Sequence, residues 1–299
     1  MKPVRIFCGM LLLSMELSAA AGQDRPLLQP HDVVAVLGGT RMVALEKGGY
    51  AESLVAAARP ADQLRWRGLA WEGDTVFSRP RELNYPPLTQ QLRSAGATVV
   101  LVQFGEMESL AGPKELPRFL EAYALLLDEV NAVTPRQILV APVPPSSVPS
   151  SPDRLAAISN YAAGIRTLAS RRNIPFLDLQ PGASPDVGDA HVGRAVAEGL
   201  VGPVVRSRSE TDSRGRFIVP DLEAVRQAVV VRNRLWFDYT RPMNWAFLAG
   251  DRTEQPSSRD HRDRNIRWFP AEMEQFVPLI QQADEQIWKT ADTAHKEVR

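Results

Sequence analysis

The sequence predicts an α/β protein with three layers, in which helices cover both faces of a parallel five-stranded sheet and a mostly helical C-terminal appendage follows. From residue 33 onward, short apolar runs bounded by turn residues alternate with helical patterns. The strongest of these runs, "TVVLVQFG" at 98–105, has four consecutive aliphatic residues, as expected of a strand buried on both faces. This alternation predicts parallel strands joined by right-handed crossovers.

Each expected strand is followed by an expected helix. The strands are 33–38, 64–71, 98–105, 137–143 and 175–179. The helices are 42–58, a short one ending at Gly96, 115–133, 152–172 and 191–202. Because parallel sheets bind ligands at the carboxyl ends of their strands, the turns after these strands are the candidate positions for a site.

Beyond this α/β region, expected at 30–205, the pattern changes. Residues 203–220 are polar and predict an exposed connection. A helical extension, 221–299, is expected to pack on the domain. Its two expected helices, 221–237 and 271–292, are separated by a charged loop, and Asp221 is expected to cap the first of them. Its aromatic residues allow a stacking surface for sugar rings or a hydrophobic seam that docks the extension, and we favour the seam. They are Trp236, Phe237, Tyr239, Trp245 and Phe247.

Residues 1–22 have the layout of a secretory signal peptide. Lys2 and Arg5 precede the apolar stretch "IFCGMLLLSM" and the small residues "SAAAGQ". Cleavage near Ala21 or Gly22 predicts a secreted or periplasmic protein; an uncleaved anchor is the alternative. No later segment approaches the ~20 apolar residues that a membrane span requires. Cys8 is the only cysteine, so the mature chain would have no disulfide and no thiol nucleophile.

Charge and histidine placement limit the partners. The chain has 35 Lys plus Arg and 35 Asp plus Glu, so no net field favours nucleic acid and a small or neutral partner is expected. The histidines do not cluster, metal-ligand spacing is absent, and there is no C-x-x-C-H sequence. We therefore expect no metal and no cofactor, and the sequence leaves the oligomeric state open.

Candidate site residues follow the strands in a fixed order. Gly38-Gly39-Thr40 follows the first strand, Gly73 the second and "FGEMES" the third, and "GDAHVG" opens the last helix. These positions resemble the conserved blocks of the SGNH, or GDSL, hydrolase superfamily, whose sheet is flavodoxin-like. The resemblance is closest to a secreted planctomycete-type subgroup whose first block reads Leu-Gly-Asn-Thr. It extends over roughly 30–285, including "AVVVRNRLWFDYTRPMNWAFL" at 228–248.

The resemblance implies an acyl-transfer site. Thr40 would be the nucleophile, His191 its base and Asp189, or its neighbour Asp186, the residue that orients the base. Gly39 and Gly73 would belong to the oxyanion hole and cleft, together with positions 107 and 108. Arg241 and Asn244 are the members of the C-terminal segment expected to reach this cleft and bind substrate.

Two blocks depart from the family pattern. Met107 stands where the family has a hydrogen-bond-donating Asn, and Gly188 stands at the usual Asp position. Glu108 corresponds to an acid that the subgroup also carries, whereas Glu106 is expected to be a solvated loop carboxylate. Thr40 could instead cap a helix that begins at residue 41, and His191 could be an ordinary surface residue.

Two functions therefore remain open. The first is an esterase-like hydrolase acting on small acyl esters, such as O-acetyl groups on carbohydrate. The second is a catalytically degenerate SGNH-fold binding protein that keeps the cleft. A structural cell-envelope component is a weaker third alternative.

Overall fold

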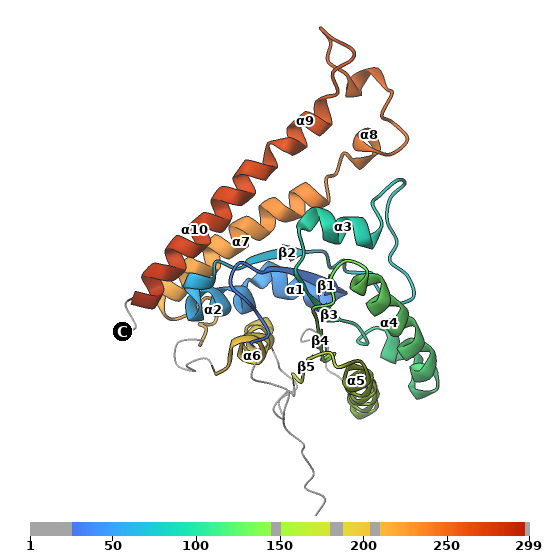
Figure 1. Ribbon diagram of the computed structural model, residues 1–299, viewed down its shortest axis with the longest axis vertical. Coiled ribbons are helices and arrows are strands. Elements are labelled where there is room, and N and C mark those ends of the chain that lie inside the picture. The colour runs from blue at the N-terminus through green and yellow to red at the C-terminus, as the bar shows by residue number, and fades with distance from the viewer. Residues whose placement is uncertain (1–25, 145–150, 180–187, 204–209, 297–299) are drawn as a thin grey trace, which may run out of the picture.

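The computed structural model describes residues 26–144, 151–179, 188–203 and 210–296. Five parallel strands form one sheet in the order β2-β1-β3-β4-β5, which is a flavodoxin-like order (Figure 1). The strands are β1 (Val33–Gly38), β2 (Arg65–Gly68), β3 (Val99–Gln103), β4 (Gln137–Val140) and β5 (Phe176–Leu177). The predicted fold class is confirmed, and each strand lies within its expected range.

Helices cover both faces of the sheet (Figure 1). One face carries α1 (Thr40–Gly48), α2 (Tyr50–Ala58) and α6 (Asp189–Val201), and the other carries α3 (Leu88–Ala95), α4 (Leu116–Asn131) and α5 (Pro152–Arg172). All residues of β1 and β3 are buried. Alternate apolar side chains of these strands therefore pack into two separate cores, one on each face.

The expected helix 42–58 is wrong in one respect, because the structure divides it in two. Gly49 adopts a left-handed conformation with φ 69° and ends α1. A Cβ at this position would lie 3.0 Å from Cγ1 of Val229 in α7 (Pro220–Thr240). The break therefore serves the close approach of a distant helix, which the local pattern does not encode.

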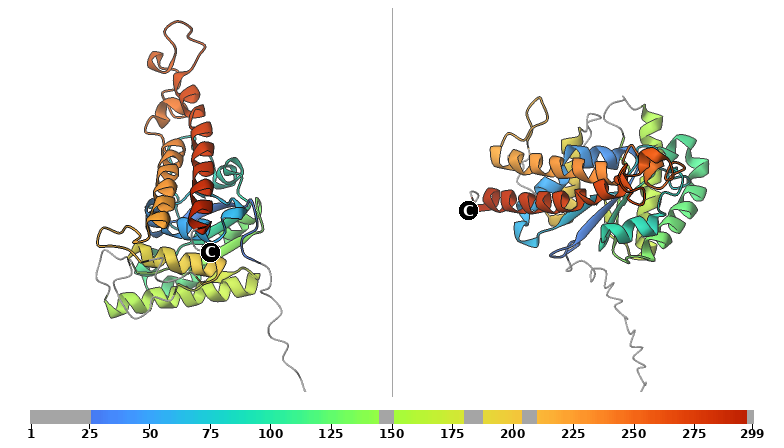
Figure 2. Two further views of the ribbon diagram at one scale, coloured as in Figure 1. Left: turned by 90° about the vertical axis from the view of Figure 1, so that its left-hand side faces the viewer. Right: turned by 90° about the horizontal axis from the view of Figure 1, so that it is seen from above.

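The C-terminal region is helical, as predicted. Helix α7 packs along α10 (Phe276–Lys296), and the two form a long arm with α8 (Trp245–Leu248) and α9 (Trp268–Glu274) towards its far end (Figures 1 and 2). The expected cap at Asp221 is wrong, because Pro220 is already the first helical residue and no side chain caps it. No helix in the described ranges is long and apolar enough to cross a bilayer.

Buried charges attach this arm to the sheet. The side chain of Arg232 in α7 is fully buried and bonds the carboxylate of Glu52 in α2 and the carbonyl of Trp66 in β2. Asp284 of α10 accepts two bonds from Arg67, one of them at 3.1 Å, and lies 3.4 Å from Arg232. Since each buried charge has an opposite partner, the network fixes α7 and α10 on β2.

Candidate functional site

The first candidate turn lies where β1 ends and α1 begins. A Cβ on Gly38 would lie 2.5 Å from the Gln103 carbonyl and 2.6 Å from Cγ of Met42, so only glycine fits there. Gly39 caps α1, and Thr40 is the first residue of the helix rather than its cap. The Thr40 hydroxyl donates a hydrogen bond of 2.7 Å to the carbonyl of Glu72.

The loop after β2 lies directly beside this turn. The backbone N–H of Trp71 donates to the Gly38 carbonyl at 3.2 Å, and a Cβ on Gly39 would lie 3.1 Å from the Asp74 carbonyl. Gly73 is exposed at the tip of the loop. No described residue accepts a hydrogen bond from the backbone N–H of Thr40 or of Gly73, so both donors are available to a ligand oxygen.

Glu108, after β3, connects the loop after β2 to the turn after β3. Its buried carboxylate accepts a bond of 2.9 Å from the Val76 N–H and one of 2.8 Å from the Gly105 N–H. The carboxylate therefore joins the turn after β3 to the loop after β2. Met107 next to it is 47% exposed, and its thioether donates no hydrogen bond.

The first turn of α6 completes the arrangement. Gly188 caps this helix, Asp189 is its first residue, and the exposed His191 follows in the same turn. Asp189 Oδ1 accepts a hydrogen bond of 2.9 Å from the buried guanidinium of Arg41, which also donates to the Pro144 carbonyl at 2.6 Å. No described residue bonds the His191 ring, and Asp186 lies outside the described residues.

Two charged residues near this edge were not among the expected site residues. Arg41 follows Thr40 directly and is buried. The sequence gives no sign of this burial, because an arginine in an amphipathic helix usually faces solvent. Glu106 is half-buried rather than solvated, and burial raises its pKa against the opposing attraction of Arg41 and Arg154. Arg154 donates 2.7 Å to Ser109 Oγ and also bonds the Glu106 carbonyl.

The C-terminal segment reaches the loop after β2 through Arg241. Its guanidinium lies 3.0 Å from Glu72 Oε2, bonds the Ala70 carbonyl and stacks 4.3 Å from the centroid of the Trp71 ring. Burial raises the pKa of Glu72, but hydrogen bonds from Lys47 and Arg241 outweigh it and lower the pKa to about 2. Arg241 thus holds the residue whose carbonyl accepts the Thr40 hydroxyl.

The tryptophans of the segment bond the protein, whereas Met243 is fully exposed. Asn244 caps α8 through its backbone, and no described residue bonds its side chain. Trp236 donates 2.7 Å to the Gly68 carbonyl, and Trp245 donates 2.8 Å to the Leu83 carbonyl and packs on Tyr85. These contacts have the character of a docking seam.

Direct bonds connect the candidate turns at the carboxyl edge of the sheet. Thr40 bonds the loop of Gly73, Glu108 bonds both that loop and the turn of Met107, and Arg41 bonds the helix of His191. These bonds bring the Thr40 hydroxyl, the loop of Gly73 and the helix turn that carries His191 to one edge. Within the described ranges, no group of three or more His, Cys, Asp or Glu could hold a metal ion.

Comparisons with known proteins found similar solved structures only. The chain matches no protein-family model and no curated protein. It is similar to the α/β hydrolase enzyme LAE5 from the metagenome of Lake Arreo, Spain, with 14% identity over 60% of this chain and 99% of that chain and a TM-score of 0.46.

Two further solved structures are similar at the same level. The lipase/acylhydrolase from Enterococcus faecalis has 15% identity over 60% of this chain and 100% of that chain, with a TM-score of 0.43. Axe2, an acetylxylan esterase from Geobacillus stearothermophilus, has 16% identity over the same shares, with a TM-score of 0.43. At this identity the likeness concerns the fold and assigns no residue a role.

Proposed function

We propose that this protein is an SGNH-type esterase-like hydrolase that cleaves small acyl esters, with O-acetyl groups on carbohydrate as the substrate class. One observation supports the proposal most strongly. The Thr40 hydroxyl, the free N–H groups of Thr40 and Gly73, and the helix turn that carries His191 are connected at one edge of the sheet. These are the group types that acyl transfer requires. The substrate class follows the family resemblance of the sequence.

The proposed reaction has two steps. Thr40 Oγ1 attacks the ester carbonyl carbon while His191 accepts the hydroxyl proton, and the N–H groups of Thr40 and Gly73 bind the resulting oxyanion. The intermediate collapses to an acyl-threonine, and the leaving alcohol takes the proton from His191. Water then attacks the acyl-threonine while His191 accepts its proton. The bond to Thr40 Oγ1 breaks, His191 returns the proton to Oγ1, and the acid is released.

Two features predict slow turnover. The Thr40 hydroxyl must leave the Glu72 carbonyl and turn towards His191, and its methyl group restricts rotation about χ1. Met107 supplies no third oxyanion donor, and loss of one such donor typically lowers the rate by ~10²- to 10³-fold. We propose that Arg41 occupies Asp189 as a counterion, which leaves the orientation of His191 to other groups.

The same features favour a second candidate, a binding protein that keeps the cleft without hydrolysis. In that case the Thr40–Glu72 bond is the permanent role of the hydroxyl, and the free N–H groups bind a carbonyl or carboxylate oxygen of a ligand that is not turned over. Arg241 and Asn244 would border the ligand cleft in both candidates.

A comparison of variants on p-nitrophenyl acetate and acetylated xylan separates the two candidates. Hydrolysis predicts that Thr40→Ala and His191→Ala each lower kcat/KM at least ~10²-fold, the scale of a lost nucleophile or general base. Thr293→Ala and His261→Ala, at exposed positions outside the edge, are the matched controls and should retain the rate. Equal background rates in all five proteins would reject hydrolysis at this site and leave the binding protein.

We further propose that residues 1–22 are a cleaved signal peptide and that the protein is secreted or periplasmic. These residues lie outside the described ranges, so the proposal stands on the sequence. The test is N-terminal sequencing of protein recovered from a secreting host. A chain that begins near Ala21 to Gln23 is expected, and a chain that retains Met1 and stays with the membranes would contradict it.

A further inference from the structure

Glu72 and Gly73 are the two central residues of a tight turn in the loop after β2. The backbone N–H of Asp74 donates 3.1 Å to the Trp71 carbonyl and closes this turn, which we call the Gly73 turn. The Glu72 carbonyl accepts the Thr40 hydroxyl at 2.7 Å. Because the proposed function also places the Gly73 N–H at the oxyanion, the geometry of this turn positions two groups of the proposed site.

Arg81, further along the same loop, holds one end of the Gly73 turn. Its guanidinium donates to both carboxylate oxygens of Asp74, each at 2.7 Å, and its Cζ lies 4.2 Å from the centroid of the Trp71 ring. The side chain of Asp74 is only 1% exposed, so water competes little for this pair. The Asp74 carbonyl is 3.1 Å from where a Cβ on Gly39 would stand, so a shift of Asp74 would also disturb the start of α1.

Arg241, directly after α7, holds the other side of the same turn. Its guanidinium donates to Glu72 Oε2 at 3.0 Å and to the Ala70 carbonyl, and its Cζ lies 4.3 Å from the centroid of the Trp71 ring. Both arginines therefore stack on one indole, and each also bonds an acidic residue of the turn. The turn is thus fixed between its own loop and the C-terminal arm.

The shape of the guanidinium group makes these contacts directional. A planar guanidinium presents parallel N–H groups to a carboxylate and a flat face to an indole, whereas an ammonium neutralises the charge without fixing an orientation. Orientation matters here because an oxyanion donor that moves by about 1 Å lowers the rate up to ~10²-fold. The arrangement around Trp71 therefore fixes the direction of the Gly73 N–H in addition to balancing charge.

We propose that Arg81 and Arg241 are positioning residues, which hold the Gly73 turn in the geometry that oxyanion binding requires. In this role neither arginine touches the reacting atoms, and each acts through Trp71 and the acidic residue that it bonds. The inference rests on the proposed function, which assigns the oxyanion to the Gly73 N–H. It gives the C-terminal arm, through Arg241, a part in the reaction.

Kinetics of Arg81 variants on p-nitrophenyl acetate test this role. Arg81→Lys keeps a cation beside Asp74 but loses the two-pronged bond and the flat face, so kcat should fall ~10-fold or more while KM changes less than about twofold. Arg81→Ala leaves room for a free guanidinium ion. Guanidinium chloride, at concentrations far below those that unfold proteins, should therefore raise the kcat of Arg81→Ala several-fold, and sodium chloride at the same concentration should not.

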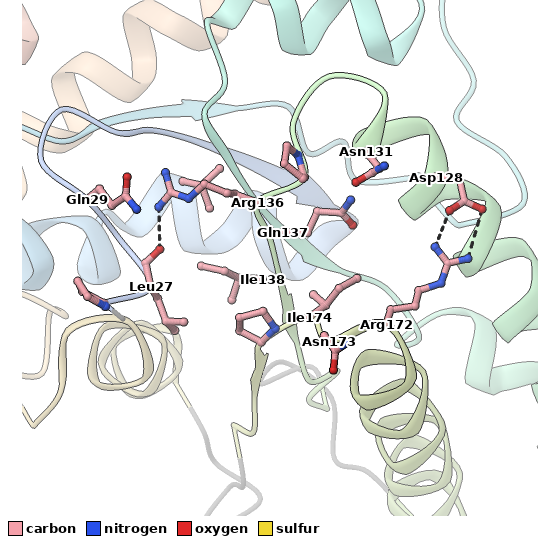
Figure 3. Close-up of a pocket in the computed structure, with 14 residues that line it drawn as sticks. Leu27, Gln29, Asp128, Asn131, Arg136, Gln137, Ile138, Arg172, Asn173 and Ile174 are labelled. Atoms are coloured by element: carbon pink, nitrogen blue, oxygen red, sulfur yellow. Dashed lines mark hydrogen bonds and ion pairs between the residues drawn. The ribbon is translucent and has the colours of Figure 1, made fainter. Parts of the chain in front are cut away.

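Arg136 offers the matched control, because it makes the same kind of pair at the opposite end of the sheet, before β4. It donates to both carboxylate oxygens of the buried Asp32, one at 2.8 Å, and donates 3.0 Å to the Leu27 carbonyl (Figure 3). Arg136→Lys weakens this pair in the way that Arg81→Lys weakens its own, and it should retain the parental kcat. An equal loss of kcat in both variants would trace the effect to stability and would overturn the inference.

Hydrogen–deuterium exchange gives a readout that does not depend on hydrolysis. In Arg81→Lys and Arg241→Lys, exchange of the amides at 71–76 should rise several-fold, because the N–H groups of Trp71 and Asp74 stay hydrogen-bonded only while the turn is held. Exchange of the same amides in the control variant should stay at the parental level.

The outcomes separate this inference from the function on which it rests. Equal rates of ester hydrolysis in the parent and in Thr40→Ala would reject the proposed function itself. Thr40-dependent hydrolysis that persists at the parental kcat in Arg81→Lys would overturn the positioning role alone. Exchange at the turn that is unchanged in both arginine variants would overturn it equally.

Discussion

The buried guanidinium of Arg41 donates a 2.9 Å hydrogen bond to the carboxylate of Asp189, although the two residues are far apart in the chain. Arg41 follows Thr40 at the start of α1, and Asp189 opens the helix that carries His191. This pair therefore sets the distance between the two helix starts that an acyl-transfer site would use. It also gives Asp189 a role other than the expected partner of His191.

Removal of Asp189 should destabilise the protein through this pair. Asp189→Ala leaves the Arg41 cation buried with only the Pro144 carbonyl, and a loss of about 1–3 kcal/mol in the free energy of unfolding is expected because Asp189 is partly exposed. Urea denaturation measures it. Asp238→Ala, which breaks an exposed pair within α7, is the control and should cost less than about 0.5 kcal/mol. Equal losses in the free energy of unfolding for the two variants would mean that the Arg41–Asp189 pair stabilises the protein no more than an exposed pair does.

A donor restored at position 107 should increase hydrolysis. Met107→Asn introduces a side-chain N–H at the position where the SGNH pattern that the sequence resembles has one, and kcat on p-nitrophenyl acetate should rise ~10- to 10²-fold. The change should leave the melting temperature unaltered because the side chain is half exposed. Met243→Asn, at a fully exposed position, is the matched control. A rate that stays at the parental level in both variants would indicate that position 107 does not face the oxyanion.

Glu46 should make the stability depend on pH. Its carboxyl lies against Gly68, where a Cβ would overlap it, and one of its oxygens is buried without a partner among the described residues. Burial raises its pKa from 4.5 to about 8, although Arg241 and Arg232 oppose the rise. The folded protein therefore keeps this proton where the unfolded chain has lost it, so stability falls as the pH rises from about 4.5 to 8.

Glu46→Gln removes this titration and should make the fall of the free energy of unfolding with pH shallower across that window. Part of the slope should remain, because burial also raises the pKa of Glu52 from 4.5 to about 7. Chemical denaturation at several pH values measures the slope. Glu285→Gln, an exposed glutamate on α10, is the control and should retain the parental slope. The explanation fails if the Glu46 variant and the control show the same dependence.

The attachment of the C-terminal arm should depend on Arg232. Arg232→Met removes the fully buried cation and leaves Glu52 and Asp284 with one arginine between them, so a loss of about 3–5 kcal/mol is expected. Arg234→Met, on the exposed side of the same helix, should change the stability by less than about 0.5 kcal/mol. Thermal unfolding measures both losses, and equal losses of stability in the two variants would contradict the role of the buried network.

The sequence predicts the central strands well because β1 and β3 are buried and largely apolar on both faces. Val99 to Val102 is an uninterrupted aliphatic run, and such a run has few alternatives to a central strand. The turn of Thr40 was also predictable, since glycines at the end of a strand before a helix mark a close approach of backbones. The break at Gly49 was not, because its cause is the approach of Val229 from a helix far along the chain.

Charged residues of the candidate site were the hardest to predict. Glu108 is expected at the oxyanion hole and cleft, but the sequence did not indicate that its carboxylate accepts bonds from the N–H groups of Val76 and Gly105. Arg241 is expected to bind substrate, which stays a prediction, and the sequence did not indicate that its guanidinium also contacts Glu72, Ala70 and Trp71. Which charges are paired depends on tertiary contacts, and single-sequence patterns carry no information on those partners.

The most direct test of the proposed hydrolysis is mass spectrometry of the protein after brief exposure to p-nitrophenyl acetate and acid quenching. The account predicts an acetyl group on the peptide that contains Thr40, present in His261→Ala and absent from Thr40→Ala. Ester turnover with no acetylated Thr40, or acetylation equally distributed over surface lysines in all three proteins, would contradict Thr40 as the nucleophile.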